Sequence, residues 1–197
     1  MFTGIVQSIG VVRAITPRGG DVELLIGAPG LDLGSVAIGD SISCSGCCLT
    51  VTRLEADAFA ADASLETLNV TTLGQWRDGQ RLNLEKALCA GQPLGGHYVT
   101  GHVDGVATVV AMVNDARSIR VQFESPPPLA RYIARKGSVC IDGVSLTVND
   151  VEAARFAVNL IPHTLEVTTL NEYHVGRRVN LEVDIIARYL ERLNAPA

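Results

Sequence analysis

The sequence contains no hydrophobic run that approaches the length of a membrane-spanning helix, and its first residues lack the basic flank and apolar run of a secretory signal. It also lacks clusters of Lys and Arg. The net charge of −5 argues against a nucleic-acid partner, which would need a basic stripe to contact phosphates. We therefore expect a cytoplasmic protein that binds neither membranes nor nucleic acids.

The motifs of several enzyme classes are missing as well. No Gly-x-Gly-x-x-Gly follows a predicted strand and no phosphate-binding loop is found, which argues against dinucleotide and nucleoside triphosphate enzymes. The absence of a nucleophile elbow argues against a Ser-His-Asp hydrolase. Cys44, Cys47 and Cys48 resemble half of a zinc site, but Cys89 and Cys140 have no companions at ligand spacing. We expect no metal and five free thiols.

What the sequence does contain is a repeat with a constant offset of 97 residues. Residues 1–6 return as 98–103, 41–51 as 138–148, 67–73 as 164–170 and 83–85 as 180–182. Each copy is long enough to bury a core of its own, and the period is too long for a solenoid or propeller repeat. The sequence therefore predicts two tandem domains, 1–96 and 97–184, that meet near Gly95 and Gly96, followed by a C-terminal segment, 185–197.

Most segments read as short strands rich in Val, Ile, Leu and Thr and bounded by turn formers, namely 5–12, 22–26, 41–44, 47–54, 59–63 and their counterparts. Asp142-Gly143 and, less clearly, Ser45-Gly46 match two-residue hairpin turns with positive φ. Segments 35–38 and 129–135 have helical character. From Ile185 the apolar residues recur at helical spacing. We predict an all-β fold of two tandem homologous, Greek-key-like six-stranded barrels plus a C-terminal amphipathic helix, which packs either on its own barrel or on another subunit.

Alternate side chains of a strand share a face, so Cys48 points with Thr50, and Ser145 with Thr147. We expect these polar pairs to line pockets rather than core positions, because unpaired buried polar groups cost about 1–3 kcal/mol each. Matched positions of the two copies differ in their chemical groups: His102 replaces Ile5, Ser145 replaces Cys48, Lys136 replaces Gly39 and Asp184 replaces Ala87. Two similar sites with unlike groups suit a reaction between two copies of one substrate.

His102 is the best candidate for proton transfer, because the pKa of an unperturbed imidazole lies near neutrality. A hydrogen-bonded core histidine is the alternative. His97 and His163 have weaker claims, since each neighbours a turn former and a solvated loop accounts for both. Asp184 directly precedes the predicted helix, so it is also a candidate N-cap that reaches Arg188. The alternative to a functional role for Lys136 is that it is an ordinary surface charge.

Several long motifs in order resemble riboflavin synthase across essentially all 197 residues. They are Met-Phe-Thr-Gly-Ile-Val from Met1, Gly-Gly-His-Tyr-Val-Thr-Gly-His-Val-Asp-Gly from Gly95, Lys-Gly-Ser-Val-Cys-Ile-Asp-Gly-Val-Ser-Leu-Thr-Val from Lys136, Ile-Pro-His-Thr-Leu from Ile161, and Asn-Leu-Glu-Val-Asp-Ile-Ile-Ala-Arg-Tyr-Leu-Glu-Arg-Leu from Asn180.

The resemblance implies a transferase that uses neither cofactor nor metal. In that family two molecules of 6,7-dimethyl-8-ribityllumazine dismutate to riboflavin and 5-amino-6-ribitylaminouracil by passing a four-carbon unit from one to the other. It also implies a homotrimer held partly by the C-terminal helices, with each site formed between an N-terminal barrel and the C-terminal barrel of a neighbour. Some relatives work inside a lumazine synthase shell, so lumazine synthase is a candidate partner.

The resemblance also implies two substrate sites. The first comprises Cys48, Leu49, Thr50, Asp62, Ala63, Ser64, Leu65, Glu66 and Thr67, closed by Gly101, His102 and Val103. The second comprises Lys136, Ser145, Leu146, Thr147, Asn159, Leu160, Ile161, Pro162, His163 and Thr164, closed by Gly4, Ile5 and Val6. His102 and Thr147 are expected to move methyl protons, and Cys48 or Ser145, or a water held by one of them, to activate C7 of the acceptor. Ser41, Asp184 and Phe2 are expected to shape or close a site.

The sequence departs from the riboflavin synthase pattern in one motif, and two other kinds of protein are alternatives to this resemblance. The family commonly has Asn-Gly-Val-Cys in the first hairpin, where this chain has Ser45-Gly46-Cys47-Cys48. Lumazine-binding antenna proteins share the fold without converting the ligand, but they lose groups in one barrel, whereas Cys48, His102, Ser145 and Thr147 are all present here. The β-barrel flavin domain of oxidoreductases normally precedes a nucleotide domain for which this chain has no room.

Overall fold

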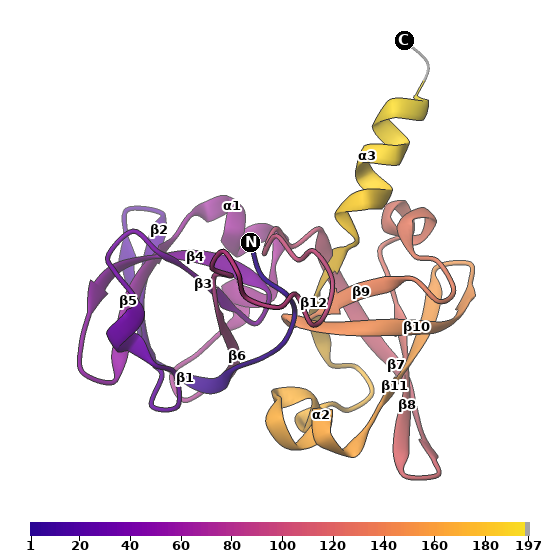
Figure 1. The fold of residues 1–197 in the computed structure, drawn as a ribbon, viewed down its shortest axis with the longest axis horizontal. Coiled ribbons are helices and arrows are strands. Elements are labelled where there is room, and N and C mark those ends of the chain that lie inside the picture. Colours follow the sequence, from indigo (N-terminus) through magenta and orange to yellow (C-terminus); the bar gives the residue numbers. More distant parts are fainter. Residues whose placement is uncertain (196–197) are drawn as a thin grey trace.

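The computed structural model describes residues 1–195 and contains two closed antiparallel barrels that lie side by side (Figure 1). The N-barrel has the strand order β1-β2-β5-β4-β3-β6. Its strands are β1 (Ser8–Arg18), β2 (Asp21–Gly27), β3 (Ser41–Cys44), β4 (Cys47–Leu54), β5 (Ala58–Ala63) and β6 (Arg81–Lys86).

The C-barrel closes in the order β10-β11-β8-β7-β12-β9, which is the same topology 97 residues later. Its strands are β7 (Gly105–Asp115), β8 (Ser118–Glu124), β9 (Ser138–Ile141), β10 (Val144–Glu152), β11 (Arg155–Leu160) and β12 (Arg178–Val183). The predicted hairpin turns are confirmed, since Ser45, Gly46, Asp142 and Gly143 all have positive φ. The predicted fold of two six-stranded barrels is therefore confirmed.

The helical segments correct several predictions. They are α1 (Leu65–Val70), α2 (Pro162–Val167), α3 (Ile185–Asn194) and the 3₁₀ segments η1 (Leu33–Ser35), η2 (Thr72–Gln75), η3 (Pro127–Tyr132) and η4 (Thr169–Glu172). The C-terminal helix is confirmed. The helical prediction for 35–38 is wrong, because η1 ends at Ser35 and the chain then becomes extended, and η3 covers only part of 129–135. Sequence analysis missed α1 and α2.

The first strand begins at Ser8 rather than at Ile5 as predicted. Gly4 takes a φ of +75°, its N–H donates to the Glu85 side chain and its carbonyl oxygen accepts from Ser145 N of the C-barrel, so this segment forms no strand ladder. The strand then continues past the predicted end at Val12 to Arg18. Ile5 and Val6 therefore suggested a strand that does not form there, because local β propensity does not report which partner a segment finds.

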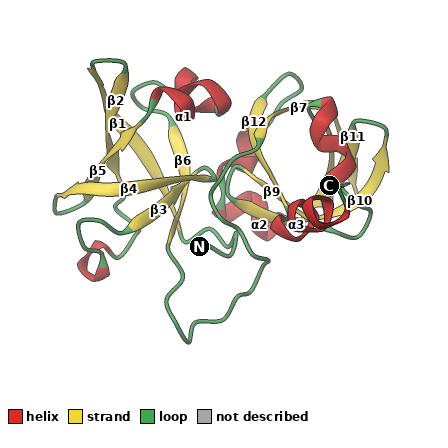
Figure 2. Cartoon of the chain, turned by 90° about the horizontal axis from the view of Figure 1, so that it is seen from above, coloured by secondary structure: helices red, strands yellow, loops and turns green. Residues whose placement is uncertain are grey.

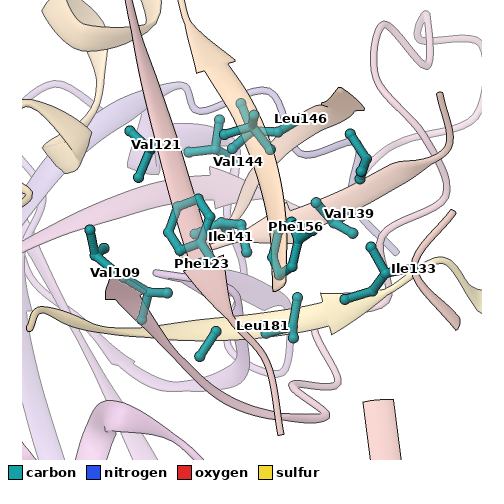
Figure 3. Close-up of a cluster of buried hydrophobic side chains, with 14 of the residues drawn as sticks. Val109, Val121, Phe123, Ile133, Val139, Ile141, Val144, Leu146, Phe156 and Leu181 are labelled. Carbon is teal, nitrogen blue, oxygen red and sulfur yellow. The ribbon is translucent and has the colours of Figure 1, made fainter. Parts of the chain in front are cut away.

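Each barrel is filled by the inward face of its strands. In β4, Cys47, Leu49 and Val51 are buried, whereas Cys48 is half-buried and Thr50 is exposed. In the C-barrel core the rings of Phe123 and Phe156 stack with their centroids 5.3 Å apart (Figure 3). The alternation follows from the two-residue period of a strand. It confirms that Cys48 and Thr50 share a face and shows that this face is not the core.

The two barrels meet at a seam, and the N-terminus lies between them (Figures 1 and 2). Matched residues exchange hydrogen bonds across the seam, which indicates an approximate two-fold relation between the barrels. Asn83 accepts a hydrogen bond from Thr169 N at 2.8 Å and donates one to Asp142 O at 2.8 Å. The matched residue Asn180 accepts one from Thr72 N at 2.7 Å and donates one to Ser45 O at 2.8 Å. Each buried asparagine thus binds two backbone groups of the opposite barrel.

None of the helices within residues 1–195 combines the length and apolarity that a membrane crossing demands. All five cysteines lie in this described part of the chain and carry free thiols, as predicted. Burial raises the pKa of Cys44 and Cys140 well above the usual range and that of Cys47 to about 12. Those three thiols therefore stay protonated and behave as core residues.

Candidate functional site

Two short segments cross from one barrel to the other. We call residues 3–5 the N-strap and residues 100–102 the C-strap. Gly4 O of the N-strap accepts a hydrogen bond from Ser145 N in the C-barrel at 2.8 Å, and Gly101 O of the C-strap accepts one from Cys48 N in the N-barrel at 2.9 Å. Each strap therefore lies directly on the strand of the opposite barrel that carries the candidate nucleophile.

Glycine is required where each strap touches that strand. A Cβ at Gly4 would lie 2.6 Å from Ser145 Cβ, and one at Gly101 would lie 2.6 Å from Cys48 Cβ. Both glycines also have positive φ, which other residues rarely adopt. The close approach places His102 and Ile5, the next residues of the two straps, beside the matched positions Cys48 and Ser145.

A buried carboxylate anchors each strap to its own barrel. Glu85 accepts hydrogen bonds from Thr3 N and Thr3 Oγ1, both at 2.7 Å, and from Gly4 N at 3.0 Å. Glu182 accepts the matched bonds from Thr100 N at 2.7 Å, Thr100 Oγ1 at 2.8 Å and Gly101 N at 2.9 Å. Burial raises the pKa of both carboxyls, and the hydrogen bonds oppose that rise.

Sequence analysis missed both glutamates, although the repeated Asn-Leu-Glu at 83–85 and 180–182 was a usable signal. It also assigned no role to Thr100, whose backbone and hydroxyl both bind Glu182. The bonds join residues about 80 positions apart in the chain, so no local pattern points to them.

The C-barrel contains a polar pair that sequence analysis undervalued. His97 Nδ1 lies 2.7 Å from Ser145 Oγ, and the histidine is only 8% exposed. Burial lowers the pKa of His97, and the negative charge of Asp184 opposes this shift. The imidazole is therefore neutral near pH 7. In the tautomer protonated at Nε2, Nδ1 accepts a hydrogen bond from the Ser145 hydroxyl, and in the other tautomer it donates one; Nε2 is buried without a partner among the described residues. The expectation of a solvated loop for His97 is wrong.

The matched position of the N-barrel is built differently. Cys48 is half-buried and packs against Phe2, which is fully buried with Val99 and Cys140. Within residues 1–195 no histidine side chain is hydrogen-bonded to Cys48. His102 on the adjoining strap is exposed, so a buried core histidine is ruled out for this position. The two barrels thus offer unlike groups on one backbone scaffold.

Other predicted site residues gather at the barrel mouths. A cavity of about 420 Å³ joins His102 and Val103 to Glu66 of α1, and its symmetry mate of about 290 Å³ contains Ile5. Ser41 lines a third cavity of about 370 Å³ together with Lys86. The predicted segments 62–67 and 159–164 are the exits of β5 and β11 into α1 and α2.

Several predicted site residues cap a helix, pack in a core or lie on the surface. Asp184 Oδ1 accepts a hydrogen bond from Ile186 N at 3.0 Å and caps α3, whereas Arg188 pairs with Asp104 instead of Asp184. Leu49 and Leu146 point into the barrel cores (Figure 3 for Leu146), so only their backbone can reach a ligand. Lys136 is exposed with a φ of +67°.

Three predicted binding residues are apolar yet open to solvent. Ile5 is 50% exposed, Ile161 52% and Leu65 55%. Single exposed apolar side chains are common on protein surfaces, so these three become a binding surface only if they form one patch with their neighbours. Ile5 does so in part, since it lines the cavity of about 290 Å³ together with Leu88 and Leu94.

The chain is similar to known proteins over both barrels. The lumazine binding domain family matches the chain twice, over residues 3–87 and 100–184. The chain is 46% identical to riboflavin synthase from Photobacterium phosphoreum over 98% of this chain and 88% of that protein. It is 45% identical to riboflavin synthase from Brucella abortus over 98% of both.

Solved structures of similar fold carry ligands of one chemical type. The crystal structure of LumP complexed with 6,7-dimethyl-8-(1'-D-ribityl) lumazine matches with a TM-score of 0.83 and 28% identity, over 93% of this chain and 99% of that one. LumP complexed with riboflavin matches with a TM-score of 0.84 and 30% identity over the same shares. Both copies of the repeat therefore have a ligand-binding relative in sequence and in structure.

Proposed function

The chain belongs to the riboflavin synthase family of lumazine-binding proteins, and from this premise we propose that its two kinds of barrel mouth present two molecules of 6,7-dimethyl-8-ribityllumazine to each other. The reaction is a transfer between identical substrates. One lumazine gives a four-carbon unit to the other, and the products are riboflavin and 5-amino-6-ribitylaminouracil. The observation that carries the proposal is the crossing of the straps, which sets His102 beside Cys48 and Ile5 beside Ser145 on matched backbones.

The dismutation needs one substrate to lose a proton and the other to be activated as an acceptor. The anion left when the 7-methyl group loses a proton is delocalised over the ring system, so the substrate acts as its own electron sink. We assign the movement of methyl protons to His102 and Thr147, which are both exposed where a ligand would lie. General acid-base groups of this type contribute roughly 10²–10⁴-fold to rate.

Activation of the acceptor at C7 falls to Ser145 in this proposal. Its hydroxyl lies 2.7 Å from a buried neutral imidazole, His97, which is an arrangement that orients a hydroxyl or a water as a nucleophile. Cys48 has no such partner among the described residues. The remaining predicted residues, Ser41, Phe2 and Asp184, then shape the mouths, with Phe2 packed behind Cys48 and Asp184 beside His97.

A binding protein without turnover is the second candidate, because the solved relative LumP has been crystallised with lumazine and with riboflavin. The complete set of Cys48, His102, Ser145 and Thr147 favours catalysis. A protein that only holds the ligand has no use for unlike proton-transfer groups in two mouths.

We further propose a homotrimer assembled partly through α3, with each active site formed between the N-barrel of one subunit and the C-barrel of the next. The support is the apolar face of α3, which stands away from its barrel (Figure 1) and exposes Ile186, Tyr189, Leu190 and Leu193. Packing against its own barrel would have buried that face. Leu190→Glu together with Leu193→Glu should give monomers by analytical ultracentrifugation and lower turnover.

The decisive experiment incubates the purified, metal-free protein with 6,7-dimethyl-8-ribityllumazine and follows both products. Two lumazines consumed for each riboflavin, with an equal amount of the pyrimidine, establish the dismutase. Tight binding without conversion would instead make the protein a lumazine carrier.

Two variants test the assignment of residues. His102→Ala should lower turnover roughly 10²-fold with little change in lumazine affinity, since it removes a proton-transfer group, and Cys48→Ala should also lower turnover more than binding. His174→Ala is the matched histidine control, because His174 is exposed outside both predicted mouths. Full turnover in both His102→Ala and Cys48→Ala would remove these residues from the mechanism.

A further inference from the structure

The seam between the barrels contains a cavity of about 270 Å³ that the lumazine chemistry does not use. We call it the seam pocket. Its charged lining consists of Arg77, Arg81, Asp142, His174, Arg177 and Arg178. Four of the sixteen Lys and Arg residues of an acidic chain thus converge on one small cavity.

The seam pocket lies on the approximate two-fold axis, so its two walls carry matched positions. Arg81 and Arg178 are 97 residues apart, as are Arg77 and His174, and Gln80 and Arg177. Cationic side chains therefore face the cavity from both barrels. Neither barrel alone would build this surface.

Acidic groups do not neutralise the pocket. Arg81 Nη1 pairs with Glu172 Oε1 at 2.6 Å across the seam. Asp142 is buried in the wall, where its oxygens accept hydrogen bonds from Tyr173 and Asn180, and burial raises its pKa to about 6. Four guanidinium groups against two carboxylates leave a positive excess. Like charges that line one cavity repel one another, and a bound anion relieves that repulsion.

One arginine in the wall has an unfilled hydrogen-bonding position. Arg177 Nε is buried and has no hydrogen-bond partner among the described residues. A buried donor that stays unpaired costs roughly 1–3 kcal/mol, and more for a charged group, so such atoms usually have a partner. In the seam pocket that partner would be an acceptor held in the cavity.

We propose that the seam pocket binds a compact phosphate-bearing anion, either inorganic phosphate or the phosphate group of a small phosphomonoester. Guanidinium forks match phosphate oxygens in two-point hydrogen bonds, which makes arginine the favoured residue for this group. The cavity lies below the size range of drug-like sites, which suits a phosphate or diphosphate rather than a whole nucleotide. Such a ligand would connect the two barrels at a point outside the lumazine mouths.

Calorimetric titration of the full chain with inorganic phosphate, with pyrophosphate and with glycerol 3-phosphate, at constant ionic strength, tests the proposal. We expect saturable binding with one site per chain, weakened at least tenfold by Arg177→Gln and by Arg178→Gln. Gln80→Glu keeps every arginine, adds a carboxylate to the wall and should weaken binding to the same degree. Arg117→Gln, at the exposed tip of the β7–β8 hairpin, is the matched control.

Lumazine turnover in phosphate-free buffer checks that each variant is folded, because none of these positions belongs to the predicted mouths. A preference for glycerol 3-phosphate over both inorganic anions would identify the phosphomonoester as the ligand type. The proposal is overturned by an absence of saturable binding, or by equal weakening in Arg117→Gln, which would reduce the effect to net charge. Retention of full affinity in folded Arg177→Gln and Gln80→Glu would also overturn it.

Discussion

The two barrels share the asparagines and glutamates that hold the backbone together, and they differ in several groups at the mouths. Asn83 and Asn180 bind the opposite barrel in the same way, and Glu85 and Glu182 anchor the straps in the same way. In contrast, Ser145 has replaced Cys48 at one matched position. A buried polar group is constrained by its hydrogen-bond partners. Cys48 and Ser145 are only half-buried, and Ser145 has His97 as a side-chain partner whereas Cys48 has none among the described residues.

This comparison separates scaffold from function within one chain. Where both copies keep the same residue, the structure supplies a close backbone approach or a full set of hydrogen bonds, as for Gly4 and Gly101. At Ile5 and His102, where the copies differ at a mouth, the side chain is exposed. At Ser45 and Asp142, which also differ, both side chains are buried and bind backbone N–H groups. A difference between copies therefore points to chemistry only where the differing side chains lie at a mouth.

The largest effect should come from the asparagines at the seam. Asn180→Ala leaves Thr72 N and Ser45 O without their partner, and Asn83→Ala does the same to Thr169 N and Asp142 O. Each unpaired buried group costs roughly 1–3 kcal/mol, so each variant should lose about 2–6 kcal/mol of unfolding free energy in urea titrations.

The exposed Asn114→Ala in β7 is the control and should lose less than about 0.5 kcal/mol. If one of the two seam variants loses several times more unfolding free energy than the other, the two barrels are not energetically equivalent.

The second largest effect is a pH dependence of folding stability that arises from Asp142. It exists only in the C-barrel, because the matched residue of the N-barrel is Ser45, which does not ionise. Burial raises the pKa of Asp142 from 3.8 to about 6, against the hydrogen bonds from Tyr173 Oη and Asn180 N. Between pH 4 and 6 the unfolded chain therefore releases this proton before the folded chain does. The contribution of Asp142 to the free energy of unfolding is greatest below pH 4 and falls by roughly 3 kcal/mol as pH rises through 6.

Asp142→Asn keeps the size and the αL-tolerant character of the side chain but cannot ionise. The stability of wild type relative to Asp142→Asn, measured by urea unfolding from pH 4 to 8, should therefore fall across this window and then level off. A difference that stays constant with pH would show that Asp142 keeps an ordinary pKa.

The smallest expected effect is a loss of kcat that separates the two candidate nucleophile positions, Ser145 and Cys48. Because His97 acts through Ser145, His97→Ala and Ser145→Ala should each lower kcat about tenfold, which is 1.4 kcal/mol, and the double variant should be no worse than either single. Cys48→Ala should combine with His97→Ala additively, since the two residues belong to different mouths.

A double variant of His97 and Ser145 whose losses add in full would contradict the pairing. The pH profile gives an independent check. Burial lowers the pKa of His97, so kcat governed by the neutral imidazole should hold to lower pH than an exposed histidine would permit.

The sequence predicted the site only as far as its local patterns reach. It identified Cys48 and Thr50 as one strand face and located the two hairpin turns, because a two-residue side-chain period and positive-φ turn residues are local properties. It predicted an exposed loop position for His97, because a turn-forming residue beside a histidine is typical of a solvated loop. The hydrogen-bond partner of the buried His97 is Ser145, 48 residues away, and no residue close to His97 in the sequence predicts this contact.

The sequence by itself determined the two-fold repeat, the barrel class, the amphipathic C-terminal helix and the family to which the chain belongs. These follow from patterns within a few residues and from a constant 97-residue offset. Only the tertiary structure decided that the straps exchange between barrels, that Glu85 and Glu182 hold them, and that arginines from both barrels converge on the seam pocket. Such contacts join residues about 50 to 140 positions apart, and their hydrogen bonds and charges exist only once both barrels have closed and docked.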